Sequence, residues 1–153
     1  MPIYLVQHGK NLDPSADPEK GLSPEGEAEV RRIAEVAAGY RVKVRIIHHS
    51  GKKRARQTAD ILAAALAPAQ GVHEVDGLAP SASAAAMAER LFPGDDRMLV
   101  GHLPFLERLV SRLIAGDPER PVFRFQNGGI VCLDHYPETT RWVIRWALMP
   151  NIG

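Results

Sequence analysis

Two histidines and one arginine stand where predicted strands end or a predicted helix begins. His8 follows the apolar run 3–6, His102 follows the apolar run 98–100, and Arg54 lies in the first turns of a predicted helix. A neutral imidazole can attack phosphorus to form a covalent phosphohistidine, and a second imidazole can donate a hydrogen bond to the transferred group. A guanidinium binds two oxygens of that group at once. These residue types predict phosphoryl-transfer chemistry, provided that the fold brings them together.

Hydrophobic periodicity predicts the elements that would position these side chains. Strands are expected at 3–6, 42–47, 72–75, 97–100, 129–133 and 141–148, and helices at 24–39, 52–67, 80–91 and 103–115. Ser23 before Pro24 suits a helix start, and Ser50 is expected to cap the helix that follows it. Strands that alternate with helices predict an α/β fold, a three-layer α/β/α sandwich. Its central sheet should be mostly parallel, with an antiparallel C-terminal pair.

The carboxyl ends of the parallel strands should bring the polar segments together. Ligands bind at that edge in open α/β sheets, so His8 and His102 are expected around one cleft. The predicted helix after residue 50 begins with Lys52, Lys53 and Arg54. Cations at a helix N-terminus oppose the macrodipole by roughly 0.3–1 kcal/mol each, and a bound anion would remove this conflict. The helix start is therefore predicted to face an anionic substrate.

The bulk composition is typical of a single globular domain, predicted to span residues 1–153. The 153 residues are 45% hydrophobic and 24% charged, with a formal net charge of +1. This charge gives no basic field for nucleic acid, and no apolar run reaches the ~18–20 residues of a membrane helix. Because no signal peptide is recognisable, the protein is expected to be cytoplasmic. The single cysteine, Cys132, is expected to be a buried apolar residue without a disulfide.

Three motifs resemble those of the histidine phosphatase superfamily, which has the phosphoglycerate-mutase-like fold. The family's Arg-His-Gly motif is matched with one change by Gln7-His8-Gly9, and its Ser-x-x-x-Arg-Ala-x-x-Thr-Ala segment by residues 50–59. Its later Gly-His is matched by residues 101–102. With the small size of the chain and the Leu-Ser-Pro-Glu-Gly element at 22–26, these motifs are most similar to those of the SixA-type phosphohistidine phosphatases.

The resemblance implies a role for each matched residue. His8 would be the nucleophile, Arg54 a phosphate ligand, and His102 a donor that stabilises the transition state. Gln7 would also bind phosphate, but it replaces the family's arginine and lacks the charge. A hydrogen bond to a charged group contributes ~1.5–3 kcal/mol against ~0.5–1.5 for a neutral one, so turnover should be slower by roughly five- to thirty-fold. No cofactor is expected, and no acidic cluster beside these segments predicts a metal site.

Several other polar residues are expected near the site without a motif to support them. The candidates for its rim are Lys10, His48, Lys52 and Lys53. Arg56 lies roughly 200° around the helix from Arg54 and should face away from it. A general acid, which alcohol leaving groups need, has no matching motif, and Glu74 and Asp76 are the candidates. The short loop 10–21 predicts an open, shallow pocket.

Three functions remain open at this point. The first is hydrolysis of phosphohistidine on a phosphorylated protein through a phospho-His8 intermediate. The second is a phosphomonoesterase or mutase that acts on a small phosphorylated substrate at the same site and needs a general acid. The third is a phosphate-binding module in which Gln7 marks weak or lost catalysis. The sequence indicates neither the substrate nor the oligomeric state.

Overall fold

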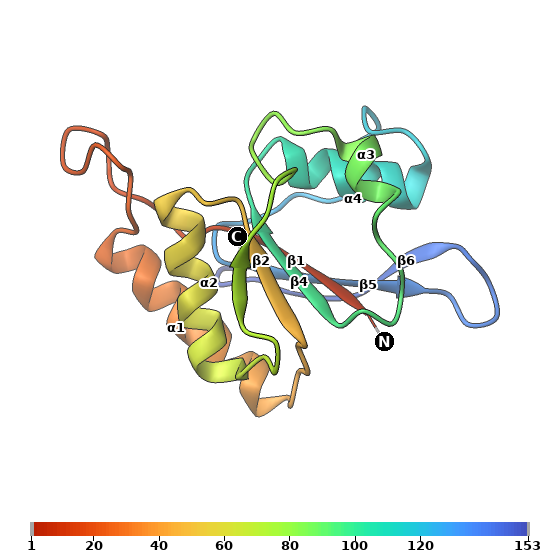
Figure 1. The fold of residues 1–153 in the computed structure, drawn as a ribbon, viewed down its shortest axis with the longest axis horizontal. Helices are drawn as coiled ribbons and strands as arrows, with labels where there is room; N and C mark the ends of the chain where they lie inside the picture. The colour runs from red at the N-terminus through yellow and green to blue at the C-terminus, as the bar shows by residue number, and fades with distance from the viewer. Residues whose placement is uncertain (1, 153) are drawn as a thin grey trace.

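The computed structural model describes residues 2–152, and it has one six-stranded mixed sheet with helices on both faces (Figure 1). The strands are β1 (Ile3–Gln7), β2 (Ile46–His49), β3 (Val72–Glu74), β4 (Arg97–Gly101), β5 (Ile130–His135) and β6 (Trp142–Leu148). The helices are α1 (Pro24–Gly39), α2 (Lys53–Leu66), α3 (Ala84–Ala88) and α4 (Phe105–Ala115). Within residues 2–152, no helix has the length and apolar character needed to cross a bilayer.

The order of strands in the sheet is β3-β2-β4-β1-β5-β6. β2 is parallel to β3 and β4, and β1 is parallel to β4. β5 is antiparallel to both β1 and β6. This confirms the predicted α/β class, with a mostly parallel sheet and an antiparallel C-terminal pair. It also makes neighbours of β2, β4 and β1, the three strands whose carboxyl ends lead into the polar segments.

β1 lies inside the sheet and is buried on both faces, which is typical of a strand with a continuous apolar run. Tyr4 and Val6 pack into a core cluster with residues of α1 and α2, whereas Ile3 and Leu5 pack with residues of α3 and α4. Figure 1 shows the two helix pairs on opposite sides of the sheet. Because both faces of β1 are packed, its carboxyl end is a rigid support for the residue that follows it. Cys132 is buried on neighbouring β5 and is a free thiol, as predicted.

α1 begins as the sequence predicted, and its first turn packs tightly against the chain after β1. The Ser23 side chain accepts a hydrogen bond from the Gly26 amide at 3.0 Å, and Pro24 is the first helical residue. A β-carbon at Gly26 would lie 2.1 Å from the Lys10 carbonyl oxygen. Glycine is therefore required there, and its contact fixes the start of the loop 10–21 against α1.

Two elements, β2 and α3, have bounds that differ clearly from the predicted ones, and α3 also ends at Ala88 rather than at residue 91. β2 begins at Ile46 rather than at residue 42, because the chain turns at Arg41 (φ 59°) and the Val42 amide donates to the Ala37 carbonyl at 3.0 Å. α3 begins only after Ser83, whose side chain caps it, rather than at residue 80. Both differences lie away from the carboxyl ends of β1 and β4, so they leave the predicted site in place.

Candidate active site

The pairing of β1 with β4 brings the two predicted histidines together. Gln7 lies opposite Gly101 in the parallel register, and the His8 amide donates to the Gly101 carbonyl at 3.1 Å. The residue that follows each of these two positions is a histidine. The ring centroids of His8 and His102 are 4.9 Å apart, with their planes tilted by 51°. The sheet thus places side by side two imidazoles that are far apart in the sequence.

Arg54 reaches the same place from the first turn of α2. Its Nε donates a hydrogen bond to His8 Nε2 at 3.2 Å. On the other side of the ring, His8 Nδ1 lies 2.7 Å from the Gly9 carbonyl oxygen. A carbonyl oxygen only accepts hydrogen bonds, so Nδ1 carries the proton and Nε2 presents a lone pair. The unprotonated nitrogen therefore faces the guanidinium that could bind the oxygens of a phosphoryl group.

Burial keeps both imidazoles neutral. His8 is 8% exposed and His102 is 1% exposed. Burial lowers the pKa of His8 from 6.5 to about 4, with the Gly9 carbonyl opposing that shift and Arg54 adding to it. Burial also lowers the pKa of His102 to about 3, and His8 and Arg54 add to the shift. Near pH 7 the His8 ring is uncharged, which is the form that a nucleophile requires.

Ser50 contacts the second histidine instead of capping α2. Its Oγ lies 2.6 Å from His102 Nε2. The cap position of α2 is Lys52, which makes no side-chain capping hydrogen bond. The predicted capping role of Ser50 is wrong, because the chain turns at Gly51 (φ 89°) before the helix begins. His102 Nδ1 is buried and has no hydrogen-bond partner among residues 2–152, so Ser50 orients the ring through Nε2.

Two further side chains, which sequence reasoning gave no role, hold the backbone around the nucleophile. Thr58 is fully buried; its Oγ1 accepts a hydrogen bond from the Gly9 amide at 2.9 Å and donates to the Arg54 carbonyl at 2.7 Å. Asn127 Nδ2 donates to the His8 carbonyl at 2.9 Å. Thr58 belongs to the matched segment 50–59, and this match could have indicated that Thr58 lies near the site. Asn127 precedes β5 in an irregular segment and carried none.

An open groove lies at the start of α2. Its volume is about 410 Å³, and its lining residues are Pro18, Glu19, Lys20, Gly51, Lys52, Lys53 and Arg54. We call it the α2 groove. The first turn of α2 has no acidic residue, so its free N–H groups and the basic side chains favour an anion. The two histidines are not in the lining, and Arg54 connects the groove to them through its bond to His8 Nε2.

Two of the predicted rim residues line the α2 groove. Lys52 is exposed there. The Lys53 ammonium lies 2.8 Å from Asp17 Oδ2, and this hydrogen bond lowers the pKa of the Asp17 carboxyl to about 2. Asp17 in turn accepts hydrogen bonds from the amides of Glu19 and Gly21. Lys53 therefore ties the preceding loop to α2, and Lys52 is the cation more available to a substrate.

The other two rim candidates are not in the lining of the α2 groove. Lys10 lies 2.8 Å from Glu25 and 3.5 Å from Glu29, so its charge is neutralised by α1 and does not replace the charge missing at position 7. The His48 ring lies on β2, 6.5 Å from the His73 ring. Arg56 is exposed on α2, as a surface residue would be.

Gln7 has unused hydrogen-bonding capacity next to the nucleophile. It is 9% exposed, and its Oε1 has no hydrogen-bond partner among residues 2–152. Buried amides are normally paired, so an unpaired one at the carboxyl end of β1 is an unusual feature. Because Oε1 only accepts hydrogen bonds, its missing partner must be a donor, and an ionised phosphoryl group could instead accept from the Gln7 Nε2 amide.

Glu74 is the proton-donor candidate that lies near the α2 groove. A β-carbon at Gly51 would lie 1.6 Å from Glu74 Oε1, so this carboxylate lies directly against the Gly51 backbone. Gly51 lines the groove, whereas neither Glu74 nor Asp76 does, so Glu74 is next to a lining residue without being one. Within residues 2–152, no group of three or more His, Cys, Asp or Glu side chains is arranged to hold a metal ion.

Comparisons with known proteins agree with this geometry. A family model described as histidine phosphatase superfamily (branch 1) matches residues 3–80. The protein histidine phosphatase SixA complexed with tungstate has a TM-score of 0.79 at 21% identity, over 98% of this chain and 97% of that chain. A protein from Agrobacterium tumefaciens assigned as a phosphohistidine phosphatase SixA has a TM-score of 0.77 at 26% identity, over 97% of each chain.

One more solved structure has a different substrate in its name. A mycobacterial glucosyl-3-phosphoglycerate phosphatase in complex with VO3 has a TM-score of 0.70 at 15% identity, over 97% of this chain and 99% of that chain. No curated protein matches the sequence. The fold is thus common to enzymes named for protein-bound and for small phosphorylated substrates.

Proposed function

The chain belongs to the histidine phosphatase superfamily and is a phosphatase, and we propose that it hydrolyses phosphohistidine on a protein without a cofactor. The observation that carries this proposal is the hydrogen bond from Arg54 Nε to the lone pair of His8 Nε2, with His102 beside both. A tetrahedral anion that entered between these groups would meet a nucleophile, a guanidinium and a second imidazole. A similar structure, SixA, is named as a complex with tungstate, which is a tetrahedral oxyanion like phosphate, and this supports an oxyanion as the ligand in the proposal.

The proposed reaction has two steps. In the first, the lone pair of His8 Nε2 attacks the phosphorus of the substrate phosphohistidine. The phosphorus–nitrogen bond breaks, and its electron pair stays on the leaving imidazole, which takes a proton from solvent. In the second step, water attacks phospho-His8, inorganic phosphate leaves, a proton passes to solvent and the neutral imidazole returns.

Charge on the transferred group is stabilised from several sides in this proposal. Arg54 binds two phosphoryl oxygens, and His102 donates a hydrogen bond to another when its Nε2 exchanges Ser50 Oγ for that oxygen. The uncapped start of α2 adds free amide N–H groups and a positive dipole end. Gln7 donates a hydrogen bond without charge, which leaves it the weakest member of the set.

The leaving group and the shape of the site favour phosphohistidine over a phosphate ester. An imidazole leaves far more easily than an alkoxide and needs little help from a general acid. The α2 groove is open, and exposed Lys20 and Lys52 lie on it, which suits the surface of a protein substrate. The likeness to SixA-type structures extends over 97–98% of this chain.

Phosphate release from a histidine-phosphorylated carrier protein tests the proposal directly. We expect catalysis that is unchanged by EDTA, and a kcat/KM for phosphohistidine well above that for p-nitrophenyl phosphate. The comparison uses the same enzyme preparation with both substrates. A kcat/KM that is higher for the ester would overturn the phosphohistidine assignment. The protein would then still be a phosphatase.

Replacing Gln7 with arginine should raise kcat. An arginine would add a charged donor that gains ~1–2 kcal/mol in the transition state, so we expect a roughly five- to thirty-fold increase. Steady-state phosphate release from the carrier protein measures it. Gln7→Lys is the informative second variant, because it adds the charge without the forked geometry and should gain less. No gain from either change would show that position 7 does not contact the phosphoryl group.

One observation favours a small-molecule phosphomonoesterase as the second candidate. The Glu74 carboxylate lies against Gly51, which lines the α2 groove although Glu74 itself does not, and from there it could protonate the oxygen of an alcohol leaving group. Under this alternative, Glu74→Gln should lower ester hydrolysis by about 10²–10⁴-fold. Under the phosphohistidine proposal, the same change should alter phosphohistidine hydrolysis by less than about threefold. Parallel assays of the variant with both substrates separate the two functions.

A further inference from the structure

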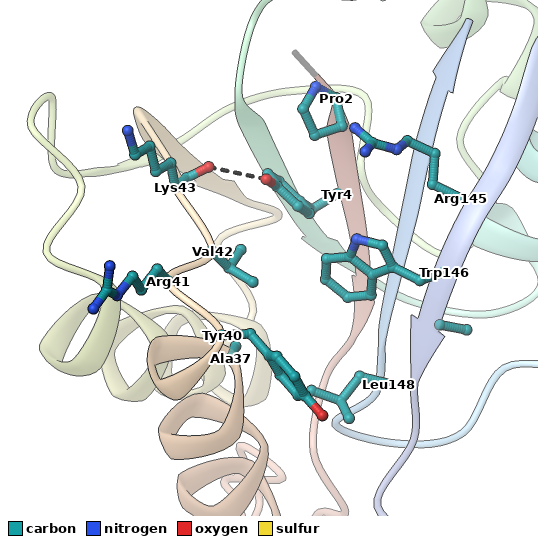
Figure 2. A pocket seen from close by; sticks show the side chains of 11 residues that line it. Pro2, Tyr4, Ala37, Tyr40, Arg41, Val42, Lys43, Arg145, Trp146 and Leu148 are labelled. Atoms are coloured by element: carbon teal, nitrogen blue, oxygen red, sulfur yellow. Dashed lines mark hydrogen bonds between the residues drawn. The ribbon is translucent and has the colours of Figure 1, made fainter. Parts of the chain in front are cut away.

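A second hollow lies toward the other end of β1 from His8 (Figure 2). Its volume is about 580 Å³, and the rings of Tyr4, Tyr40 and Trp146 are part of its lining. We call it the aromatic hollow. Tyr4 precedes His8 by four residues on the same chain, which corresponds to roughly 13 Å at the rise of a strand. None of the residues of the α2 groove lines it.

The aromatic hollow exists because α1 ends before it covers the sheet completely. α1 stops at Gly39, and the chain turns at Arg41 toward β2. The sheet face that carries Tyr4 and Trp146 is therefore left open beside the end of the helix, as Figure 2 shows. The two ring centroids are 6.0 Å apart, and the Tyr4 hydroxyl donates to the Lys43 carbonyl at 3.0 Å. These contacts hold the wall in one shape without a ligand.

The charged side chains that line the hollow are basic, and no acidic residue within residues 2–152 is in its lining. Arg41, Lys43 and Arg145 are the charged residues among those that line it. Arg145 lies 3.4 Å from Asp134, whereas Arg41 and Lys43 are exposed and have no ion-pair partner within residues 2–152. Figure 2 shows Arg41 and Lys43 on the side of the hollow formed by the chain between α1 and β2, with their charged ends directed away from the Tyr4 and Trp146 rings, so both long side chains would turn toward an anion at the opening. A negatively charged ligand would find two uncommitted cations here.

We propose that the aromatic hollow binds a small organic anion with a flat apolar body, such as an aromatic carboxylate, phosphate or sulfonate. The body would stack on the Trp146 ring and contact the Tyr40 ring, which is 79% exposed when nothing covers it. The anionic group would lie at the opening beside Arg41 and Lys43. The volume falls within the ~300–1,000 Å³ of small-molecule sites.

A pair of dyes that differ only in charge tests the inference. The anionic dye is 8-anilinonaphthalene-1-sulfonate, and the neutral dye is N-phenyl-1-naphthylamine, which has the same rings without the sulfonate. We expect one anionic dye per chain by fluorescence titration of the full-length protein. The double change Arg41→Asn with Lys43→Gln should lower the affinity for the anionic dye by about tenfold or more. The affinity for the neutral dye should fall by less than about threefold. Asparagine is used at position 41 because it tolerates the left-handed backbone there.

Two further variants make the result specific. Arg120→Gln removes an exposed cation that does not line the hollow and should leave the binding of both dyes unchanged. Tyr40→Ala should lower the affinity for both dyes by about fivefold or more, because it removes apolar contact area and no charge. The inference is overturned if the double change affects the two dyes equally, if several dyes bind per chain, or if an acidic aromatic peptide displaces the dye more strongly than the free aromatic acid does. Displacement by orthovanadate would also overturn it, by assigning the dye to the α2 groove instead.

Discussion

Replacing His8 with alanine should lower the turnover of phosphohistidine by at least about 10⁴-fold, because the atom that attacks phosphorus is removed. The structure makes this a sharp expectation. The Gly9 carbonyl holds the proton on Nδ1, so Nε2 is unprotonated, and Arg54 Nε marks the place where the phosphoryl oxygens would lie. The check is twofold: the rate of phosphate release, and trapping of an acid-labile phosphoenzyme with radiolabelled substrate.

A matched histidine elsewhere in the chain provides the control. His73 is exposed on β3, and its ring nitrogen lies 2.7 Å from the Gln70 carbonyl. His73→Ala should change the rate by less than about twofold and leave phosphoenzyme formation intact. Comparable thermal unfolding of both variants would exclude a folding defect. A His8→Ala protein that still forms the acid-labile intermediate would mean that another residue is the nucleophile.

The protonation state of His8 can be tested without a substrate. Because burial lowers its pKa to about 4, the ring resonances of His8 should titrate well below pH 6.5 in histidine NMR spectra, and His8→Ala assigns them by their loss. The same shift sets a pH dependence of stability. The unfolded chain takes up a proton near pH 6.5 and the folded chain only near pH 4, so the free energy of unfolding should fall as the pH decreases between these values. A midpoint near 6.5 would contradict the buried, neutral ring.

The strand ends of the site could be predicted from the sequence because they depend on local patterns. An apolar run followed by a polar residue places His8 and His102 at strand ends, and the parallel topology then brings those ends to one edge. A basic helix start without acidic residues indicated an anion near Arg54. Each strand end and the helix start depend on residues that are neighbours in the sequence, so a local pattern is enough to predict them.

The supporting contacts could not be predicted, because they join segments that only the tertiary structure brings together. Ser50 is two residues before the cap of α2 and was expected to be that cap, yet its hydroxyl lies against His102. Asn127 holds the His8 carbonyl from an irregular segment with no pattern of its own. Lys10 is close to His8 in sequence, but the tight packing of the loop on Gly26 directs its charge to α1. Closeness to His8 in the sequence therefore does not predict which cations lie near the site.

Replacing Arg54 with glutamine should lower kcat by about 10²–10³-fold, the usual effect of losing one charged donor to a transition state. The guanidinium is placed by α2 and touches His8 Nε2, so its loss removes charge and forked geometry at the reacting atoms. Arg54→Lys should recover part of the rate, because an ammonium restores the charge without the second hydrogen bond. KM should rise less than kcat falls if the contact is stronger in the transition state than in the bound substrate.

Arg56 is the matched control for Arg54, because it lies two residues further along the same helix and is exposed. Arg56→Gln removes the same charge from α2, at a rotation of roughly 200° around the helix axis, and should change kcat by less than about threefold. Equal losses in both variants would mean that the net charge of the helix start, acting at a distance, is what the reaction uses. A large loss at Arg54 alone would instead require direct contact with the phosphoryl group, since the two substitutions differ only in where the guanidinium lies.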